Sequence, residues 1–269
     1  MKLCRFQPLV PQAPNSVSSV ESYAGPRFGI VEGASVREAS GDFTGGWKSG
    51  ERVWELKEVK LLPPSVPSKI VCVGRNYREH ASELGNEVPA EPLIFLKPPS
   101  AIIAPDEPIV MPTISRRVDY EGEIGVIIGR TCSQLAEGDD ALRYIAGFTC
   151  VNDVTARDLQ KSDGQWTRGK GFDTFCPFGP VMETQLDLGA ATVETYINGA
   201  RKQSAPATEM IFSIDVIIRW ISRVMTLLPG DLIATGTPAG VGPMQPGDVV
   251  EIVVSGVGTL RNPVTAQGN

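Results

Sequence analysis

The sequence predicts a mainly β protein of the α+β type, with a small N-terminal domain in front of a larger one. Glycine and proline supply 28 and 22 of the 269 residues, and so turn-rich a composition favours many short strands over a helical bundle. Short runs rich in valine and isoleucine recur between these turns, as expected for strands. A chain of this length also buries enough surface to fold without disulfides or structural metals.

Residues 1–65 are expected to form the small N-terminal domain and residues 66–269 the larger one. In the first, Phe28–Gly33 is predicted to form a strand that ends in a turn, and Val53–Val59 a short amphipathic segment. Leu61–Pro67 follows with three prolines, which cannot continue a helix or a central strand. We therefore expect a linker there.

Six apolar segments of the larger domain are predicted strands, because each has the length of a strand and is bounded by glycine or proline. They are Ile70–Val73, Leu93–Leu96, Ala101–Ala104, Ile124–Ile128, Leu232–Ala234 and Val249–Val254. One long helix is expected at Thr208–Leu227, where apolar residues recur at helical spacing until Pro229 and Gly230 end it. A shorter helix is expected at Tyr77–Leu84.

Composition and charge exclude several classes of protein. The net charge of −6, without any basic run, argues against a nucleic-acid or membrane-surface partner. No apolar run is long enough to span a membrane, and charges interrupt the N-terminus where a signal peptide would be apolar. The five cysteines are scattered without a C-x-x-C motif, which suggests neither a zinc finger nor a disulfide framework. We therefore expect a soluble, cytoplasmic protein.

Acidic residues are the candidate metal ligands, because His80 is the only histidine and excludes H-E-x-x-H and three-histidine sites. Glu121 and Glu123 lie two apart in a predicted strand, so they project from the same face. Asp153 follows the apolar run Phe148–Val151, and if that run is a neighbouring strand the three carboxylates converge. Hard oxygen ligands of this kind suit Mg²⁺, Mn²⁺ or Ca²⁺, and a solvated acidic face is the alternative.

Three further segments offer groups for acid–base or anion chemistry. His80 and Glu83 are neighbours if the segment is helical, and a carboxylate beside an imidazole orients it and favours its charged form. A general base uses this pairing to take a proton from water; an exposed histidine with a chance acidic neighbour is the alternative. Lys170, in a glycine-flanked loop, either reaches a substrate anion or lies on the surface. Thr235–Pro243 resembles a backbone nest for an anion.

Five ordered motifs run through the larger domain. They are V-G-R-N-Y-x-x-H-x-x-E at 73–83, D-Y-E-G-E-I-G-V at 119–126, N-D-V-T-A-R-D-L-Q at 152–160, K-G-F-D-T-F-C-P-F-G-P at 170–180 and G-D-L-I-A-T-G-T-P-A-G-V-G-P at 230–243. This set resembles the fumarylacetoacetate hydrolase family over residues 68–265. Residues 1–65 are similar to the small α+β domain that many bacterial members carry. The resemblance implies a mixed β-sandwich roll and a homodimer.

The resemblance also implies a metal-dependent site for a small-molecule 2-oxo acid. Glu121, Glu123 and Asp153 would hold a divalent ion, either Mg²⁺ or Mn²⁺ with Ca²⁺ as a further option. This ion would chelate the carboxylate and 2-oxo oxygens of the substrate.

The same resemblance implies roles for five more residues. His80 and Glu83 would form a water-activating dyad on a lid helix that orders over the substrate. Lys170 and Gln160 would stabilise an oxyanion or an enolate. Thr237 would contact the substrate carboxylate.

The expected reaction is hydrolysis of a C–C bond in an acylpyruvate or a fumarylpyruvate-type 2-oxo acid. The same fold hosts decarboxylases of 2-oxo acids such as oxaloacetate and isomerases of 2-hydroxyhepta-2,4-diene-1,7-dioate, and both are alternatives. A dyad that delivers water favours hydrolysis. A metal-binding scaffold with a retired active site is the non-enzymatic alternative, and the complete set of site residues argues against it.

Overall fold

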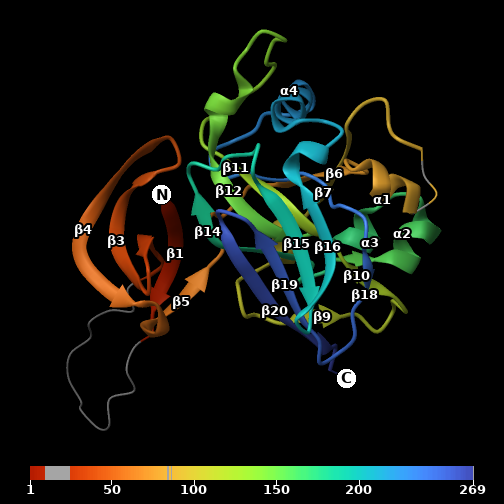
Figure 1. Ribbon diagram of the computed structural model, residues 1–269, viewed down its shortest axis with the longest axis horizontal. Helices are drawn as coiled ribbons and strands as arrows, with labels where there is room; N and C mark the ends of the chain where they lie inside the picture. The colour runs from red at the N-terminus through yellow and green to blue at the C-terminus, as the bar shows by residue number, and fades with distance from the viewer. Residues whose placement is uncertain (10–24, 84, 86, 269) are drawn as a thin grey trace.

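The computed structural model describes residues 1–9, 25–83, 85 and 87–268, and Figure 1 shows how its elements are arranged. Most of the described elements are strands, which confirms the mainly β class. The N-terminal strands lie at one side of the molecule, and the C-terminal strands form part of a roll at the other (Figure 1). Three short helices gather beside the roll: α1 (Arg78–Glu83), α2 (Arg157–Asp163) and α3 (Thr167–Lys170).

The described strands form three sheets, of which the largest has twelve strands. In sheet order its main path is β4 (Gly45–Glu55), β3 (Ser35–Asp42), β2 (Arg27–Glu32), β1 (Lys2–Pro8), β14 (Cys176–Glu183), β12 (Ile145–Asn152), β11 (Gly122–Ile128), β17 (Leu232–Ala234), β6 (Ile70–Gly74) and β7 (Leu93–Lys97). Two more strands join from the side, β5 (Val59–Leu62) on β1 and β8 (Ile102–Ile103) on β14.

The two smaller sheets and the remaining helices complete the fold. The five-stranded sheet is β16 (Ala200–Pro206), β15 (Thr192–Ile197), β19 (Val249–Val254), β20 (Gly258–Ala266) and β9 (Ile109–Met111), and the three-stranded sheet is β13 (Thr155–Ala156), β10 (Val118–Tyr120) and β18 (Gly242–Pro243). The longest described helix is α4 (Ile214–Val224), and the 3₁₀ turns are η1 (Leu56–Glu58), η2 (Pro99–Ala101), η3 (Ala141–Tyr144) and η4 (Ala207–Glu209). No helix among the described residues combines the length and apolar character needed to cross a membrane.

The core of the roll lies between the large sheet and the five-stranded sheet. Alternate residues of β19, Val250, Ile252 and Val254, are buried and belong to one apolar cluster with Ile124 and Val126 of β11. This alternation places one face of each strand in the core. Glu121 and Glu123 alternate with these core residues along the chain, so their side chains project from the opposite face of β11.

The N-terminal strands continue the sheet of the larger domain. Lys2 and Leu3 of β1 pair with Glu183 and Met182 of β14, so backbone hydrogen bonding runs across the proposed boundary. The described residues of 1–65 contain strands and the turn η1 but no α-helix. The expected linker begins later than predicted, because Leu61 and Leu62 still pair with β1. The boundary near residue 65 stays a prediction.

The long helix predicted at Thr208–Leu227 is wrong at both ends, since only Ile214–Val224 is α-helical. The residues before it are drawn into a tertiary contact: Asn76 accepts hydrogen bonds from the amides of Ile211, through its backbone carbonyl, and Phe212, through its side chain, both at 2.8 Å. These bonds hold the residues just before the helix in a non-helical conformation, after the short turn η4. Apolar spacing along the sequence contains no sign of such a distant partner.

Smaller differences concern segment boundaries. The predicted strand Ala101–Ala104 is reduced to β8, because the prolines before it favour the turn η2. Val53–Val59 divides between the end of β4, η1 and the start of β5. The shorter predicted helix is observed as α1, while its last predicted residue, Leu84, lies outside the described residues.

Candidate active site

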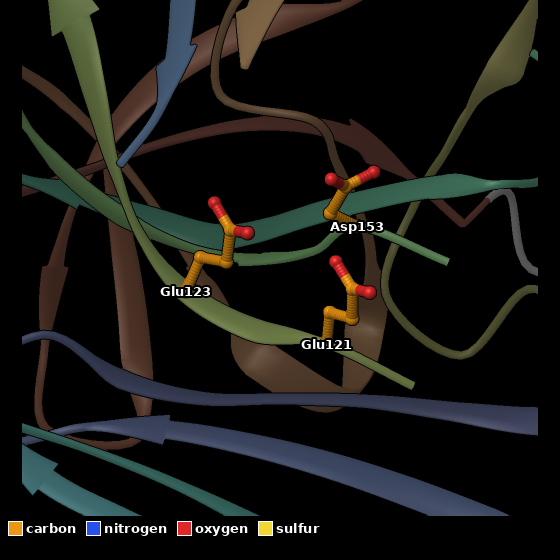
Figure 2. A group of neighbouring side chains, drawn as sticks. All are labelled: Glu121, Glu123 and Asp153. Atoms are coloured by element: carbon orange, nitrogen blue, oxygen red, sulfur yellow. The ribbon is translucent and has the colours of Figure 1, made fainter. Parts of the chain in front are cut away.

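Three acidic side chains meet where two neighbouring strands lie side by side, on the face of β11 that is turned away from the five-stranded sheet. Glu123 lies in β11, Glu121 directly precedes that strand, and Asp153 directly follows β12. The antiparallel pairing of Gly122 with Asn152 brings them together, and the Asp153 amide donates to the Glu121 carbonyl at 2.9 Å. All three are buried, with one oxygen of each within 4.8 Å of the others, and the carboxylates face a common space (Figure 2). The carboxylates thus converge as the strand pattern predicted.

Lysine and arginine side chains surround part of this cluster. The Lys170 Nζ lies 2.7 Å from Glu121 Oε2 and 2.6 Å from Asp153 Oδ2. The buried Lys97 pairs with the other oxygen of Asp153, and Arg157 pairs with the other oxygen of Glu121. Burial by itself would raise the pKa of Glu121, but Lys170 and Arg157 outweigh it and hold that pKa well below its usual value. Glu121 is therefore ionised.

Glu123 has no comparable cation among the described residues. Its Oε2 accepts a hydrogen bond from the Gly236 amide at 2.8 Å. Burial, together with the charges of Asp153 and Glu121, raises its pKa well above the usual value. A divalent ion would supply the positive charge that this carboxylate lacks, and carboxylate oxygens are the ligands that such ions prefer. The three residues therefore fit a divalent metal.

His80 and Glu83 both lie on α1. His80 is 5% exposed, and its Nδ1 has no hydrogen-bond partner among the described residues. A Glu83 oxygen lies 3.7 Å from that nitrogen, too far for a hydrogen bond, and the carboxylate instead accepts from the Gly240 amide. Burial lowers the pKa of His80, with Arg157 adding to the effect and Glu121 opposing it. The imidazole is therefore neutral, whereas the sequence pattern favoured its charged form.

A cavity of about 300 Å³ connects these groups. Every predicted site residue except Glu83 is among the described residues that line it: His80, Glu121, Glu123, Asp153, Gln160, Lys170 and Thr237. The Gln160 side-chain oxygen accepts a hydrogen bond from Arg157 at 2.7 Å. Thr237 Oγ1 donates to the Gly122 carbonyl at 2.9 Å. The catalytic and substrate-binding roles of these residues stay predictions.

The glycine-rich loop after β17 binds carboxylates of the protein itself. The backbone amide of Gly236 donates to Glu123, and that of Gly240 donates to Glu83. The nest predicted at Thr235–Pro243 is thus used in part to hold a cluster carboxylate and the end of α1.

Three cationic residues near the cluster were not predicted from the sequence. Arg157 and Arg75 stand inside the quoted motifs N-D-V-T-A-R-D-L-Q and V-G-R-N-Y, so a signal for both was present. Arg157 also pairs with the buried Asp119, which fixes its guanidinium. Lys97 is the last residue of the apolar strand β7 and is followed by two prolines. A lysine at the end of an apolar run was the only local sign that this side chain is buried beside the cluster.

Comparison with known proteins identifies the family. The family model described as "Fumarylacetoacetate (FAA) hydrolase C-terminal" matches residues 69–265, which is most of the chain. The chain belongs to the fumarylacetoacetate hydrolase family. A second family model, "Rv2993c-like, N-terminal", matches residues 20–64.

Similar proteins include members of this family from several bacteria. Protein Rv2993c of Mycobacterium tuberculosis is 52% identical over 220 residues, which cover 81% of this chain and 83% of the relative. Oxaloacetate tautomerase YisK of Bacillus subtilis is 41% identical over 230 residues, covering 80% of this chain and 75% of the relative. The crystal structure of 2-hydroxyhepta-2,4-diene-1,7-dioate isomerase from Mycobacterium marinum matches all of both chains with a TM-score of 0.87 at 44% identity. This likeness confirms the fold of the fumarylacetoacetate hydrolase family.

Proposed function

We propose that this protein is a divalent-metal-dependent enzyme that moves a proton at C3 of a 2-oxo dicarboxylic acid and so interconverts its keto and enol forms. The observation that carries the proposal is the buried His80, whose Nδ1 has no partner among the described residues and which lines a cavity beside three converging carboxylates. A neutral imidazole is suited to remove a proton. The names of two relatives, an oxaloacetate tautomerase and a dienedioate isomerase, support this class of reaction.

Glu121, Glu123 and Asp153 would hold the metal, for which we propose Mg²⁺ or Mn²⁺, with Ca²⁺ as a further option. When bound, the ion would supply Lewis acidity toward the carboxylate and 2-oxo oxygens of the substrate. The three side chains reach this position from the ends of paired strands, which are rigid supports. Their burial keeps bulk water away from the reacting atoms.

Lys170 would stabilise the negative charge that develops on the substrate oxygen. Burial lowers the pKa of its ammonium group, but Asp153 and Glu121 outweigh burial and raise that pKa above the usual value. The side chain therefore stays charged, and beyond its bonds to Glu121 and Asp153 it has one N–H left for an enolate oxygen. In the keto-to-enol direction the imidazole of His80 takes the C3 proton, and water protonates the enolate oxygen as the enol leaves. In the reverse direction water removes the hydroxyl proton and the imidazolium returns a proton to C3.

The charge of the cavity wall supports a substrate with two carboxylates. Arg75 and Lys161 both line the cavity, and neither takes part in an ion pair among the described residues. The Arg75 guanidinium lies 5.9 Å from the ring centroid of Trp166. Gly74 permits this arrangement, because a Cβ there would lie 2.7 Å from the Trp166 ring. A guanidinium held in this way is suited to bind a second carboxylate of a small dianion such as oxaloacetate.

Hydrolysis of a C–C bond is the second candidate. It requires His80 and Glu83 to act together on water, and the 3.7 Å between Nδ1 and a Glu83 oxygen is short enough for a small movement to complete the pair. Proton transfer is favoured because it needs only the single neutral imidazole that already lies in the cavity.

One experiment separates these reactions. The protein is supplied with Mg²⁺ and oxaloacetate in D₂O, and deuterium entry at C3 is followed by NMR beside release of carbon dioxide. Pyruvate release from an acylpyruvate is measured in parallel, with metal alone and EDTA-treated protein as controls. We expect C3 exchange to be much faster than either release. Pyruvate from the acylpyruvate as the main result would favour hydrolysis, carbon dioxide would favour decarboxylation, and no reaction would favour the retired scaffold.

A further inference from the structure

Gln203 forms a buried hydrogen-bonded link between the two sheets of the roll. It lies on β16 of the five-stranded sheet and is 2% exposed. Its Oε1 accepts from the Gly122 amide at 3.0 Å and from Thr195 Oγ1 at 2.6 Å. Its Nε2 donates to Thr237 Oγ1 and to the Pro238 carbonyl, both at 2.8 Å. Four hydrogen bonds therefore satisfy this side-chain amide completely.

The chemistry of the partners fixes the orientation of this amide. The Gly122 N–H can only donate, and the Pro238 carbonyl can only accept, so the oxygen must face the first and the nitrogen the second. Thr237 donates its own hydroxyl hydrogen to the Gly122 carbonyl, so it must accept from Gln203. Neither glutamate nor an apolar residue can reproduce this set of contacts.

Gly122 is the point at which this link reaches the carboxylates. It stands between Glu121 and Glu123, and both of its backbone polar groups are held from outside the strand, the N–H by Gln203 and the carbonyl by Thr237. A Cβ at this position would lie 2.1 Å from the Thr195 hydroxyl. Only glycine lets the link approach so closely, which agrees with the close packing that the bare face of this residue permits.

We propose that Gln203 is a positioning residue that sets the separation and direction of Glu121 and Glu123 and couples them to Thr237. The oxygen of its amide holds the peptide between the two metal-binding carboxylates. The nitrogen holds the loop that presents Thr237 to the cavity. Loss of the whole amide should therefore weaken metal binding and substrate binding together, while loss of the nitrogen alone should weaken substrate binding.

The first test compares wild-type protein with Gln203→Met and with the matched control Asn262→Leu. Asn262 is also 2% exposed, and its amide donates to the carbonyls of Ala104 and Glu107, both at 2.9 Å, outside the cavity lining. The Mn²⁺ dissociation constant is measured by electron paramagnetic resonance without substrate. Because residues that support metal ligands typically change affinity by about 10- to 100-fold, we expect that rise for Gln203→Met. We expect none for Asn262→Leu.

The second test uses Gln203→Glu. This variant tests the positioning role of Gln203 even if Gln203→Met does not fold. A glutamate can still accept from the Gly122 amide and from Thr195, but it cannot donate to Thr237 and Pro238. We expect Mn²⁺ affinity to be retained. The oxalate dissociation constant of the Mn²⁺-loaded protein should rise by roughly tenfold, the equivalent of the one hydrogen bond that Thr237 loses. Unchanged oxalate binding in this variant would overturn the coupling to Thr237.

The inference rests on the metal site of the proposed function, and Mn²⁺ binding distinguishes failure of one from failure of the other. If wild-type protein binds no Mn²⁺, the assignment of Glu121, Glu123 and Asp153 as ligands is wrong. If wild-type protein binds Mn²⁺ and Gln203→Met binds it equally well, the ligands stand and the positioning role of Gln203 is wrong.

Discussion

The carboxylate of Glu83 accepts the backbone N–H of Gly240, with its two oxygens at 3.1 and 3.2 Å from the nitrogen, and so joins the C-terminal end of α1 to the loop after β17. Gly240 has a φ of 99°, and a Cβ there would lie 2.3 Å from the Lys202 carbonyl, so only glycine fits. His80 is three residues before Glu83 on the same helix. This contact therefore helps to keep the imidazole in the cavity.

The first prediction concerns opening of this helix, since a lid that admits substrate is held weakly when the site is empty. Amides of Arg78–Glu83 should exchange with solvent faster than those of β11, and oxalate with Mg²⁺ should slow them. Glu83→Ala should speed exchange in the ligand-free protein. Hydrogen-exchange mass spectrometry measures all three effects. Exchange in α1 as slow as in β11, and unaffected by oxalate, would show that α1 is no lid.

The second prediction concerns the metal. Dialysis against EDTA should abolish turnover, and Mg²⁺ or Mn²⁺ should restore it. Glu123→Gln keeps the size of the side chain but removes a charged ligand, so Mn²⁺ binding and activity should both fall sharply. Glu194→Gln is the matched control, because Glu194 pairs with Arg201 outside the cavity. Full activity in exhaustively demetallated protein would contradict the assignment.

The third prediction concerns His80 as the base. His80→Ala should reduce C3 proton exchange by about a hundred- to ten-thousand-fold, the usual contribution of a general base. Mn²⁺ affinity should be retained, because His80 is not assigned as a ligand. No second histidine is available to replace it in this chain. Pyruvate release from an acylpyruvate is measured in the same variant, and proton exchange at the wild-type rate would remove His80 from the mechanism.

The fourth prediction concerns pH. His80 acts as a base only when neutral, and burial lowers its pKa below the ordinary value of 6.5. Activity should therefore persist as pH falls through 6.5 and decline only as pH passes through the lower pKa of the folded protein. A bound divalent cation shifts the pKa in the same direction, because it disfavours a charged imidazolium nearby. The pH profile of kcat/KM at saturating Mg²⁺ measures this limb, and a decline that begins above pH 6.5 would be inconsistent with a neutral buried base.

The fifth prediction concerns substrate charge. Arg75→Met should raise KM for oxaloacetate by roughly ten- to a hundredfold, since a hydrogen bond to a charged group is worth about 1.5–3 kcal/mol. KM for 2-oxobutanoate, which lacks the second carboxylate, should not change. Steady-state kinetics on both acids makes the comparison. An equal loss on both would assign Arg75 to the cavity wall and not to recognition of the second carboxylate.

The sequence by itself identified the family and the carboxylate cluster because both depend on local patterns. Glu121 and Glu123 share a face through the two-residue period of a strand, and Asp153 ends an apolar run. Gly122 between them has no side chain, and a Cβ there would lie 2.1 Å from the Thr195 hydroxyl, so glycine is what allows the close packing. Local patterns fail where a partner is distant, as in the non-helical segment before α4 that Asn76 holds.

Only the tertiary structure decided what surrounds the cluster. Lys97 comes from β7, at the far edge of the large sheet, and Gln203 comes from the second sheet, and no spacing in the sequence places either beside Asp153 or Gly122. The protonation of His80 is likewise a tertiary property. Glu83, three residues away, raises the pKa of His80 and so favours its charged form. Burial lowers that pKa by more than Glu83 raises it. The effect of burial depends on everything packed around the imidazole, which no local pattern in the sequence contains.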